Sequence, residues 1–364
     1  MYHTSAHHHR RKPTTTRPQL SLIQAPPGPP AMAFTMHSHS GQFCPGHAVD
    51  QLEDIVRHAI SIGFKTMGLS EHMPRYEERD LYPEELDDTD AAGNSDPQAS
   101  LAVLPPRHEA YLVEAQRLQA KYAAQLHILV GFEAEFIRPS YAPHVLALAA
   151  DPRVDYFVGS LHHVHGHPID YGPDAYAAAV LAAKNKEEDR PTPRDGENVE
   201  DEETTLWEDY YDQQRDMLLS LRPRVVGHFD LIRLLAKDPA RDPRAWSGVW
   251  ERVLRNLAIV KEQGGWLECN TAALRKGLAE PYPCRAIAEE WLKMGGKFTM
   301  SDDSHGIAHV ATNYARGAAY LESLGVEHVW TFHRRPQTDL GDGGARPTLD
   351  EAAVPLREFT QLFK

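Results

Sequence analysis

Short apolar segments alternate with longer amphipathic segments along most of the chain after residue 33. The short segments are rich in β-branched and aromatic residues and are bounded by polar ones, which is typical of strands. In the longer segments apolar residues recur at helical spacing, as Leu52, Ile55, Val56 and Ala59 do. The strands that this pattern predicts are Phe34–His39, Thr66–Ser70, Leu126–Phe132, Asp155–Ser160, Arg224–Gly227, Trp266–Asn270 and Lys297–Ser301.

The order of the predicted strands and helices indicates the class of fold. Strands that alternate with helices are usually parallel and belong to one α/β domain. We therefore expect a single barrel-like α/β domain over residues 32–364. The predicted helices cover residues 52–60, Glu109–Tyr122, Thr205–Leu221, Trp246–Lys261 and Ala286–Leu292.

Three regions break this rhythm. Residues 1–31 contain prolines, histidines and basic residues but no acidic residue, a composition that predicts a disordered leader. A true start at Met32 and a transit peptide are the alternatives, and the prolines argue against the transit peptide. The stretches near residues 80–100 and 184–204 are acidic and polar, and we expect them to be exposed insertions in the domain.

Composition narrows the possible partners and compartments. The formal charge of −14 argues against general affinity for nucleic acid or an anionic membrane surface. The longest run of small apolar residues, 175–183, is far shorter than the ~20 residues of a membrane span. An odd number of cysteines, 3, argues against a disulfide framework and favours the reducing cytoplasm. The unusual feature is the presence of 21 histidines, which suggests metal chemistry.

Residues able to bind a metal follow almost every predicted strand. His37 and His39 are two residues apart, so on a strand they share a face and can hold one ion. Six of the seven predicted strands end in a His, Glu or Asp. A single such residue is most simply explained as a hydrogen-bonded core or loop residue. For six strand ends, that explanation would require six independent coincidences. Barrel enzymes build their active sites at these carboxyl ends, so the pattern predicts a metal site there. Cys44 lacks a CxxC partner and is expected to be a packed residue.

Read in order, the strand-end motifs resemble those of the PHP (polymerase and histidinol phosphatase) family. Three other segments, residues 41–48, 227–232 and 268–275, are similar to the monofunctional histidinol-phosphatases of fungi and many bacteria. The resemblance runs from Phe34 to the C-terminus, and the leader and the two insertions depart from it. The motifs are His37-Ser38-His39, Ser70-Glu71-His72, Gly131-Phe132-Glu133, Ser160-Leu161-His162 and Ser301-Asp302-Asp303-Ser304-His305.

This resemblance implies a distorted (β/α)7 TIM-like barrel with three divalent metal ions at the carboxyl ends of its strands. One ion would be held by His37, His39, Glu133 and Asp303. Glu133 would bridge to a second ion, held also by His162 and His228. The third would be held by His47, His72 and His305.

Two of these placements have alternatives, because His163 stands next to His162 and Asp302 next to Asp303. The Asp-Ser-His spacing of the family favours Asp303. Nitrogen and oxygen ligands without a thiolate suit Zn, Fe or Mn. Such ions bring the pKa of bound water near 7, so the resemblance implies that a metal-bound hydroxide attacks phosphorus without a covalent phosphoenzyme.

The implied substrate is a small phosphomonoester, L-histidinol phosphate, which is hydrolysed to L-histidinol and phosphate in L-histidine biosynthesis. Candidates to bind the phosphate are Arg275, Arg233 and Arg75, with Asn270 at the neighbouring strand end. The candidates for the substrate ammonium are Asp230 and Asp170.

Three alternatives remain at this point. Another PHP-family phosphoesterase would act on a different small phosphomonoester or on a nucleic-acid 3′ end, and the net charge disfavours the nucleic acid. A metal-binding regulator without catalysis predicts gaps in the ligand set, and the sequence has none. An amidohydrolase-like barrel would normally bridge its metals with a lysine, whereas Glu133 takes that position here.

Overall fold

The strands form two parallel sheets. The computed structural model describes residues 33–86, 96–188, 203–334 and 349–363 besides Met1, so the leader predicted at 1–31 lies outside the described residues apart from Met1. Parts of the two predicted insertions also lie outside them. The first sheet has the order β1 (Phe34–Thr35), β2 (Thr66–Leu69), β3 (His127–Val130). The second has the order β10 (Phe298–Ser301), β9 (Trp266–Asn270), β8 (Val225–Val226), β5 (Val158–Ser160), β4 (Glu133–Glu135).

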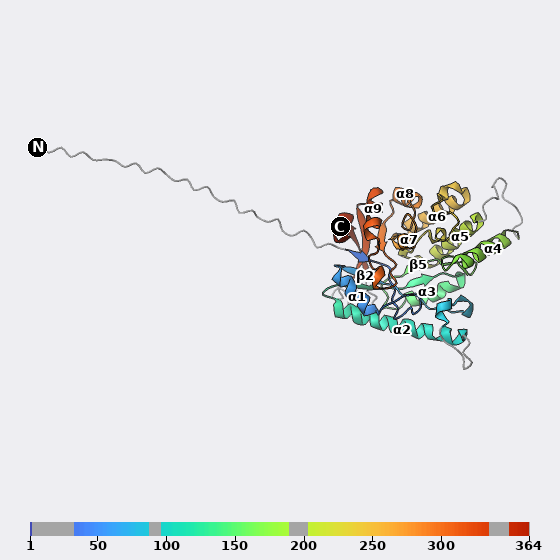
Figure 1. Ribbon diagram of the computed structural model, residues 1–364, viewed down its shortest axis with the longest axis horizontal. Coiled ribbons are helices and arrows are strands. Elements are labelled where there is room, and N and C mark those ends of the chain that lie inside the picture. Colours follow the sequence, from blue (N-terminus) through green and yellow to red (C-terminus); the bar gives the residue numbers. More distant parts are fainter. Residues whose placement is uncertain (2–32, 87–95, 189–202, 335–348, 364) are drawn as a thin grey trace. The chain divides into compact units, whose positions relative to one another are not determined.

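Helices follow most of these strands, as the alternation predicted. Figure 1 shows α2 on one side of the strands and α6 and α8 on the other. The helices are α1 (Leu52–Ser61), α2 (Pro97–Tyr122), α3 (Ala142–Ala149), α4 (Pro173–Glu188), α5 (Thr204–Leu221), α6 (Ser247–Gln263), α7 (Ala272–Arg275), α8 (Arg285–Lys293), α9 (Tyr314–Ser323) and α10 (Leu356–Phe359). Two antiparallel pairs, β6 (His163–Val164) with β7 (His167–Pro168) and β11 (His328–Arg334) with β12 (Leu349–Pro355), complete the described strands.

Backbone contacts also join the two sheets at both of their borders. The amide of Met36 donates to the carbonyl of Met300 at 3.1 Å, and Ser38 forms a parallel bridge with Ser304. At the other border His72 forms a parallel bridge with Glu133. The α/β class with parallel sheets is therefore confirmed, whereas closure into a barrel stays a prediction.

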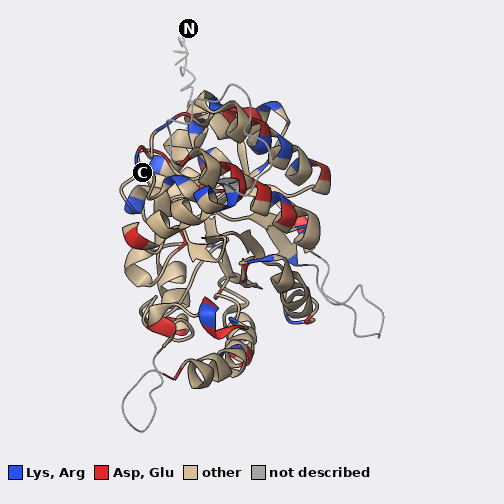
Figure 2. Cartoon of the chain, turned by 90° about the vertical axis from the view of Figure 1, so that its right-hand side faces the viewer, with Lys and Arg blue, Asp and Glu red and all other residues tan. Residues whose placement is uncertain are grey.

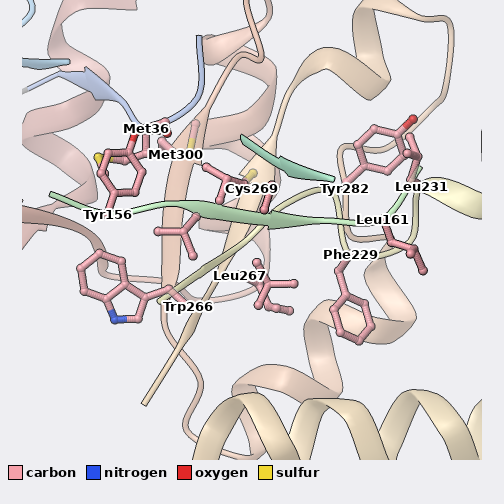
Figure 3. Close-up of a cluster of buried hydrophobic side chains, with 14 of the residues drawn as sticks. Met36, Tyr156, Leu161, Phe229, Leu231, Trp266, Leu267, Cys269, Tyr282 and Met300 are labelled. Atoms are coloured by element: carbon pink, nitrogen blue, oxygen red, sulfur yellow. Dashed lines mark hydrogen bonds between the residues drawn. The ribbon is translucent and has the colours of Figure 1, made fainter. Parts of the chain in front are cut away.

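A buried tyrosine ties the first sheet to the second. The hydroxyl of Tyr156 donates to the carbonyl of Met36 at 2.6 Å, and Figure 3 shows the two side chains together beside Met300. The ring lies so close to Gly68 and Gly131 that a Cβ there would be 2.1 and 2.6 Å from its atoms. Glycine is required at both positions, and the contact fixes the backbone just before His37.

Helix α2 departs most from the sequence prediction. It begins at Pro97 rather than Glu109, with Asp96 as an N-cap whose carboxylate accepts from the amide of Ala99 at 3.0 Å. Pro105 and Pro106 lie inside it, although proline normally ends a helix. Both prolines are exposed, so the carbonyls that they leave without an amide donor can bond to water.

Charged residues cover the helices in a mixed pattern. Figure 2 shows Lys and Arg interspersed with Asp and Glu along the helices. In the stretch predicted to be the first insertion, Asp80 is instead buried and pairs with Arg138. None of the helices that the structure describes has the length and apolar character needed to cross a membrane.

Replacing Gly68 by Ala should lower the free energy of unfolding by about 1–3 kcal/mol, the usual cost of overpacking a core. The new Cβ would lie 2.1 Å from the Tyr156 hydroxyl. Gly172→Ala is the matched control because no atom lies within 4 Å of a Cβ there, so its effect should stay within about 0.5 kcal/mol. Urea unfolding measures both, and equal stability of the two variants would contradict the role of Tyr156.

Candidate metal centre

Imidazoles and carboxylates from both sheets meet at the carboxyl ends of the strands. His37 and His39 follow β1, and Glu133 begins β4 shortly after β3. The Nε2 atoms of His37 and His39 lie 3.3 and 3.5 Å from Oε2 of Glu133. Oδ1 of Asp303, which follows β10, lies 3.7 and 3.5 Å from the same nitrogens. The spacing of His37, His39 and Glu133 can accommodate one metal ion, with Asp303 beside it.

A second group lies on the other side of the Glu133 carboxylate. Oε1 of Glu133 is 3.0 Å from Nε2 of His228, which follows β8. The same oxygen is 3.4 Å from Nε2 of His162, which follows β5. These three side chains can also hold one ion. In these two groups each oxygen of Glu133 thus faces its own pair of histidines, and Oε2 also lies 3.1 Å from Nδ1 of His72.

The third group differs in one member from the sequence prediction. His72 and His305 lie together as expected, but the third side chain within ligand distance of them is His39. The ring of His47 is 4.6 Å from that of His305 between centroids, and its Nδ1 lies 3.2 Å from Oε1 of Glu84. With 41% of its side chain exposed, His47 is at the edge of the cluster. Its role as a ligand stays a prediction.

The two sequence alternatives occupy different surroundings. Nδ1 of His163 is 3.8 Å from Glu135, and its ring lies beside Tyr82 rather than beside Glu133. Asp302 accepts from the hydroxyl of Thr35 at 3.1 Å and from the amide of Ala311 at 2.6 Å. Both therefore face away from the two groups around Glu133, which favours His162 and Asp303.

The chemistry of these side chains fits divalent metal ions. Nε2 of His37 and of His39 is buried without a hydrogen-bond partner among the described residues. Burial, followed by the charge of His72, lowers the pKa of His39 to about 3, so its ring is neutral and offers a lone pair. Burial opposes ionisation of Glu133, but His37 and His162 outweigh it and hold its pKa well below the usual value. His39 thus offers a lone pair and Glu133 a negative charge, which are the two kinds of donor that a divalent cation requires.

Asp303 is held in an unusual backbone conformation. Its φ is 48°, in the left-handed region that non-glycine residues rarely adopt. Two N–H groups of Arg275 donate to the carbonyls of Asp302 and Asp303, both at 2.8 Å. Nδ1 of His305 lies 2.9 Å from the Asp303 carbonyl. These contacts hold the loop that presents the Asp303 carboxylate.

The structure separates the predicted substrate residues. Arg233 and Asp230 are buried and pair with each other at 2.9 Å. Asp230 also accepts from the amide of Cys284 at 2.8 Å, and neither residue lines the cavity beside the cluster. Asn270 donates to Oε2 of Glu268 at 3.1 Å and lies 3.5 Å from Oδ2 of Asp303. The direct roles predicted for Arg233 and Asp230 are not supported, because the two form an ion pair with each other away from the cavity.

A cavity of about 700 Å³ opens over the cluster. Arg275, Arg75 and Asp170 line it, together with the groups around Glu133. Arg75 is buried and pairs with Glu135 at 3.2 Å and with Glu85 at 3.5 Å. Among the described residues no carboxylate forms an ion pair with Arg275. The cavity therefore offers one unneutralised guanidinium near the metal groups.

Two buried carboxylates next to the ligands were not predicted as site residues. Glu135 lies 3.1 Å from Nδ1 of His162, and Glu268 lies 2.9 Å from Nδ1 of His37. Glu268 lies within the mostly apolar strand β9 and Glu135 ends the short strand β4, and neither has a basic residue adjacent in sequence. That pattern was the available signal, because an unpaired charge inside a sheet is costly unless it has a purpose.

Comparison with known proteins finds a matching family model and two fungal relatives. The family model of the PHP domain matches residues 35–272. A probable histidinol-phosphatase of Schizosaccharomyces pombe is 36% identical over 306 residues, covering 84% of this chain and 91% of its own. A histidinol-phosphatase of Saccharomyces cerevisiae is 28% identical over 321 residues, covering 80% and 89%.

Two solved structures share the fold. A putative histidinol phosphatase from Listeria monocytogenes has a TM-score of 0.57 and 24% identity, covering 78% of this chain and 99% of its own. A histidinol phosphate phosphatase from Lactococcus lactis, complexed with Zn, L-histidinol and phosphate, has a TM-score of 0.53 and 15% identity. That match covers 82% of this chain and 96% of the other.

Replacing Glu133 by Gln should reduce the number of metal ions retained after dialysis, because the amide removes the charge shared by two groups. The loss of metal affinity should be at least about 100-fold, because replacing a residue that only contacts a metal ligand already costs up to that much. Glu135→Gln is the matched control on the same strand, since its charge is paired with Arg75, and it should retain more metal. Elemental analysis measures both, and the reverse order would make Glu135 the bridge.

Proposed function

Because the chain belongs to the PHP domain family, we propose that it is a metal-dependent histidinol-phosphatase. It hydrolyses L-histidinol phosphate to L-histidinol and phosphate in L-histidine biosynthesis. The observation that carries this proposal is the Glu133 carboxylate between two pairs of histidines, beneath a cavity that Arg275 lines. The names of the fungal relatives support the choice of substrate.

The proposed cofactors are three divalent ions. Each of the three histidine groups has the spacing for one ion. The donors are nitrogen and oxygen atoms, which suits Zn, Fe or Mn, and the Lactococcus lactis protein of similar fold is complexed with Zn. The proposed ligands are His37, His39, His47, His72, Glu133, His162, His228, Asp303 and His305.

We also propose that the two sheets are parts of one distorted (β/α)7 barrel. The Met36–Met300 hydrogen bond at one border and the His72–Glu133 bridge at the other support this closure. Closure matters for the reaction because it brings strand ends from both sheets around a single carboxylate. The ligands then converge although they are dispersed in the sequence.

In this site, bound divalent ions supply an acidified water and offset the negative charge of the phosphoryl group. The protein's own side chains hold and orient the reactants. Glu133 and Asp303 keep negative charge in the cluster, and the buried rings exclude bulk water. Arg275 uses two of the five N–H groups of a guanidinium for backbone carbonyls, and the others are available to phosphate oxygens.

Asp170 is the proposed partner of the substrate ammonium. It lines the cavity, and its nearest basic partner is Lys276 at 3.9 Å, a long and partly exposed contact. Asp230, the other sequence candidate, pairs with Arg233 and the Cys284 amide and does not line the cavity. A phosphate held near Arg275 and an ammonium near Asp170 would select a small molecule that carries both charges. We place this activity in the cytoplasm, as the odd number of cysteines favours.

Chelation tests the metal requirement and the substrate together. A strong chelator should abolish phosphate release from L-histidinol phosphate, and added Mn, Fe or Zn should restore it. The same assay with simple phosphomonoesters and single-stranded DNA should show much lower kcat/KM. Full activity in a demonstrably metal-free preparation contradicts the mechanism. Equal rates on all phosphomonoesters contradict the substrate but not the family.

Replacing Asp170 by Asn should lower kcat/KM for L-histidinol phosphate by about tenfold to 100-fold, the cost of one charge-assisted contact of about 1.5–3 kcal/mol. Its kcat/KM for an aryl phosphate without an ammonium should stay unchanged. Arg275→Gln is the contrasting variant, because every substrate shares the phosphate and both values should fall. Equal losses on both substrates in Asp170→Asn would remove the ammonium role.

A further inference from the structure

Glu268 is a completely buried carboxylate at the centre of β9, directly behind the metal centre. Its Oε1 lies 2.9 Å from Nδ1 of His37. Its Oε2 accepts from the backbone amide of His228 at 3.0 Å and from the side-chain amide of Asn270 at 3.1 Å. One carboxylate therefore contacts residues that belong to two different metal groups.

In the part of the chain that the structure describes, no lysine or arginine pairs with the charge of Glu268. Among the described residues, its one ion-pair partner is His37. Glu135, which also stands behind a proposed ligand, is different because Arg75 pairs with it at 3.2 Å. A buried carboxylate is costly unless a positive charge compensates it. Within the described ranges, that charge can reach Glu268 only from the direction of His37, where the metal groups lie.

The contact also decides which nitrogen of His37 faces the metal groups. An ionised carboxylate can only accept, so the 2.9 Å contact requires a proton on Nδ1 of His37. Nε2, on the far side of the ring, then faces Glu133 at 3.3 Å and Asp303 at 3.7 Å and is the nitrogen left to bind a cation. Carboxylates behind metal-bound histidines commonly fix the ring in this way and raise its basicity.

We propose that Glu268 is the positioning residue of the metal centre. It orients His37 toward the first group, anchors the backbone of His228 in the second, and supplies a negative charge that the cations balance. This proposal rests on the metal centre of the proposed function but not on its substrate. Glu268 itself does not contact the reacting atoms.

Binding isotherms of the metal-free full-length protein with Zn²⁺ test the role directly. Glu268→Gln keeps the side-chain length and an acceptor oxygen but removes the charge, so its apparent affinity should fall by about 10–100-fold. Cys269→Ala is the matched control. It changes the next residue of β9, which is equally buried but contacts the Gly317 carbonyl, and its isotherm should match the wild type. Superimposable isotherms for Glu268→Gln and the wild type would overturn the proposal.

A measurement on the wild type keeps the proposal testable if Glu268→Gln fails to fold. In nitrogen-correlated NMR spectra of the Zn-loaded protein, His37 should retain a slowly exchanging proton on Nδ1, assigned by its absence in His37→Gln. A His37 ring without that proton would overturn the proposal. If the wild type binds no divalent ion, the proposed function falls with it, whereas normal wild-type binding with an unaffected Glu268→Gln removes only Glu268.

Discussion

The two oxygens of Glu133 face opposite pairs of histidines, and this single buried carboxylate sets the geometry of the centre. Oε2 lies toward His37 and His39, and Oε1 toward His162 and His228. The two oxygens of one carboxylate lie close together, so both groups must approach within a few ångström of each other. Only strand ends that converge from both sheets can satisfy that requirement, which ties the fold to the chemistry.

The convergence of strand ends could be predicted from the sequence because the signal there is local. Strand Trp266–Asn270 has the predicted bounds, and His37, Glu133 and Asp303 lie together as expected. The ion-pair partners of the candidate side chains could not be predicted, because they depend on the three-dimensional structure. Arg233 looked available for phosphate, yet it pairs with Asp230 three residues earlier. Helix α2 was predicted too short because prolines normally end a helix. Its two prolines are tolerated because they face solvent, and their exposure depends on the fold.

The surroundings of the histidines show how charge is distributed outward from the centre. Nδ1 of His162 is backed by Glu135, and Glu135 in turn is neutralised by Arg75. Nδ1 of His37 is backed by Glu268, which has no such cation among the described residues. Two rings of the same chemical type therefore meet different electrostatic surroundings. The ions in the two groups should differ in how firmly they are held, even though their direct ligands are alike.

The loop that carries Asp303 connects the proposed metal site with the proposed phosphate site. Its left-handed backbone is held by Arg275, the same residue that faces the cavity with its remaining N–H groups. A cation drawn to the Asp303 carboxylate stiffens the loop and so orients the guanidinium for an anion. If these proposed roles hold, thermodynamic reciprocity requires an anion on Arg275 to tighten the binding of the cation by the same factor. Metal and phosphate would then be heterotropic effectors of one another through a single turn of backbone.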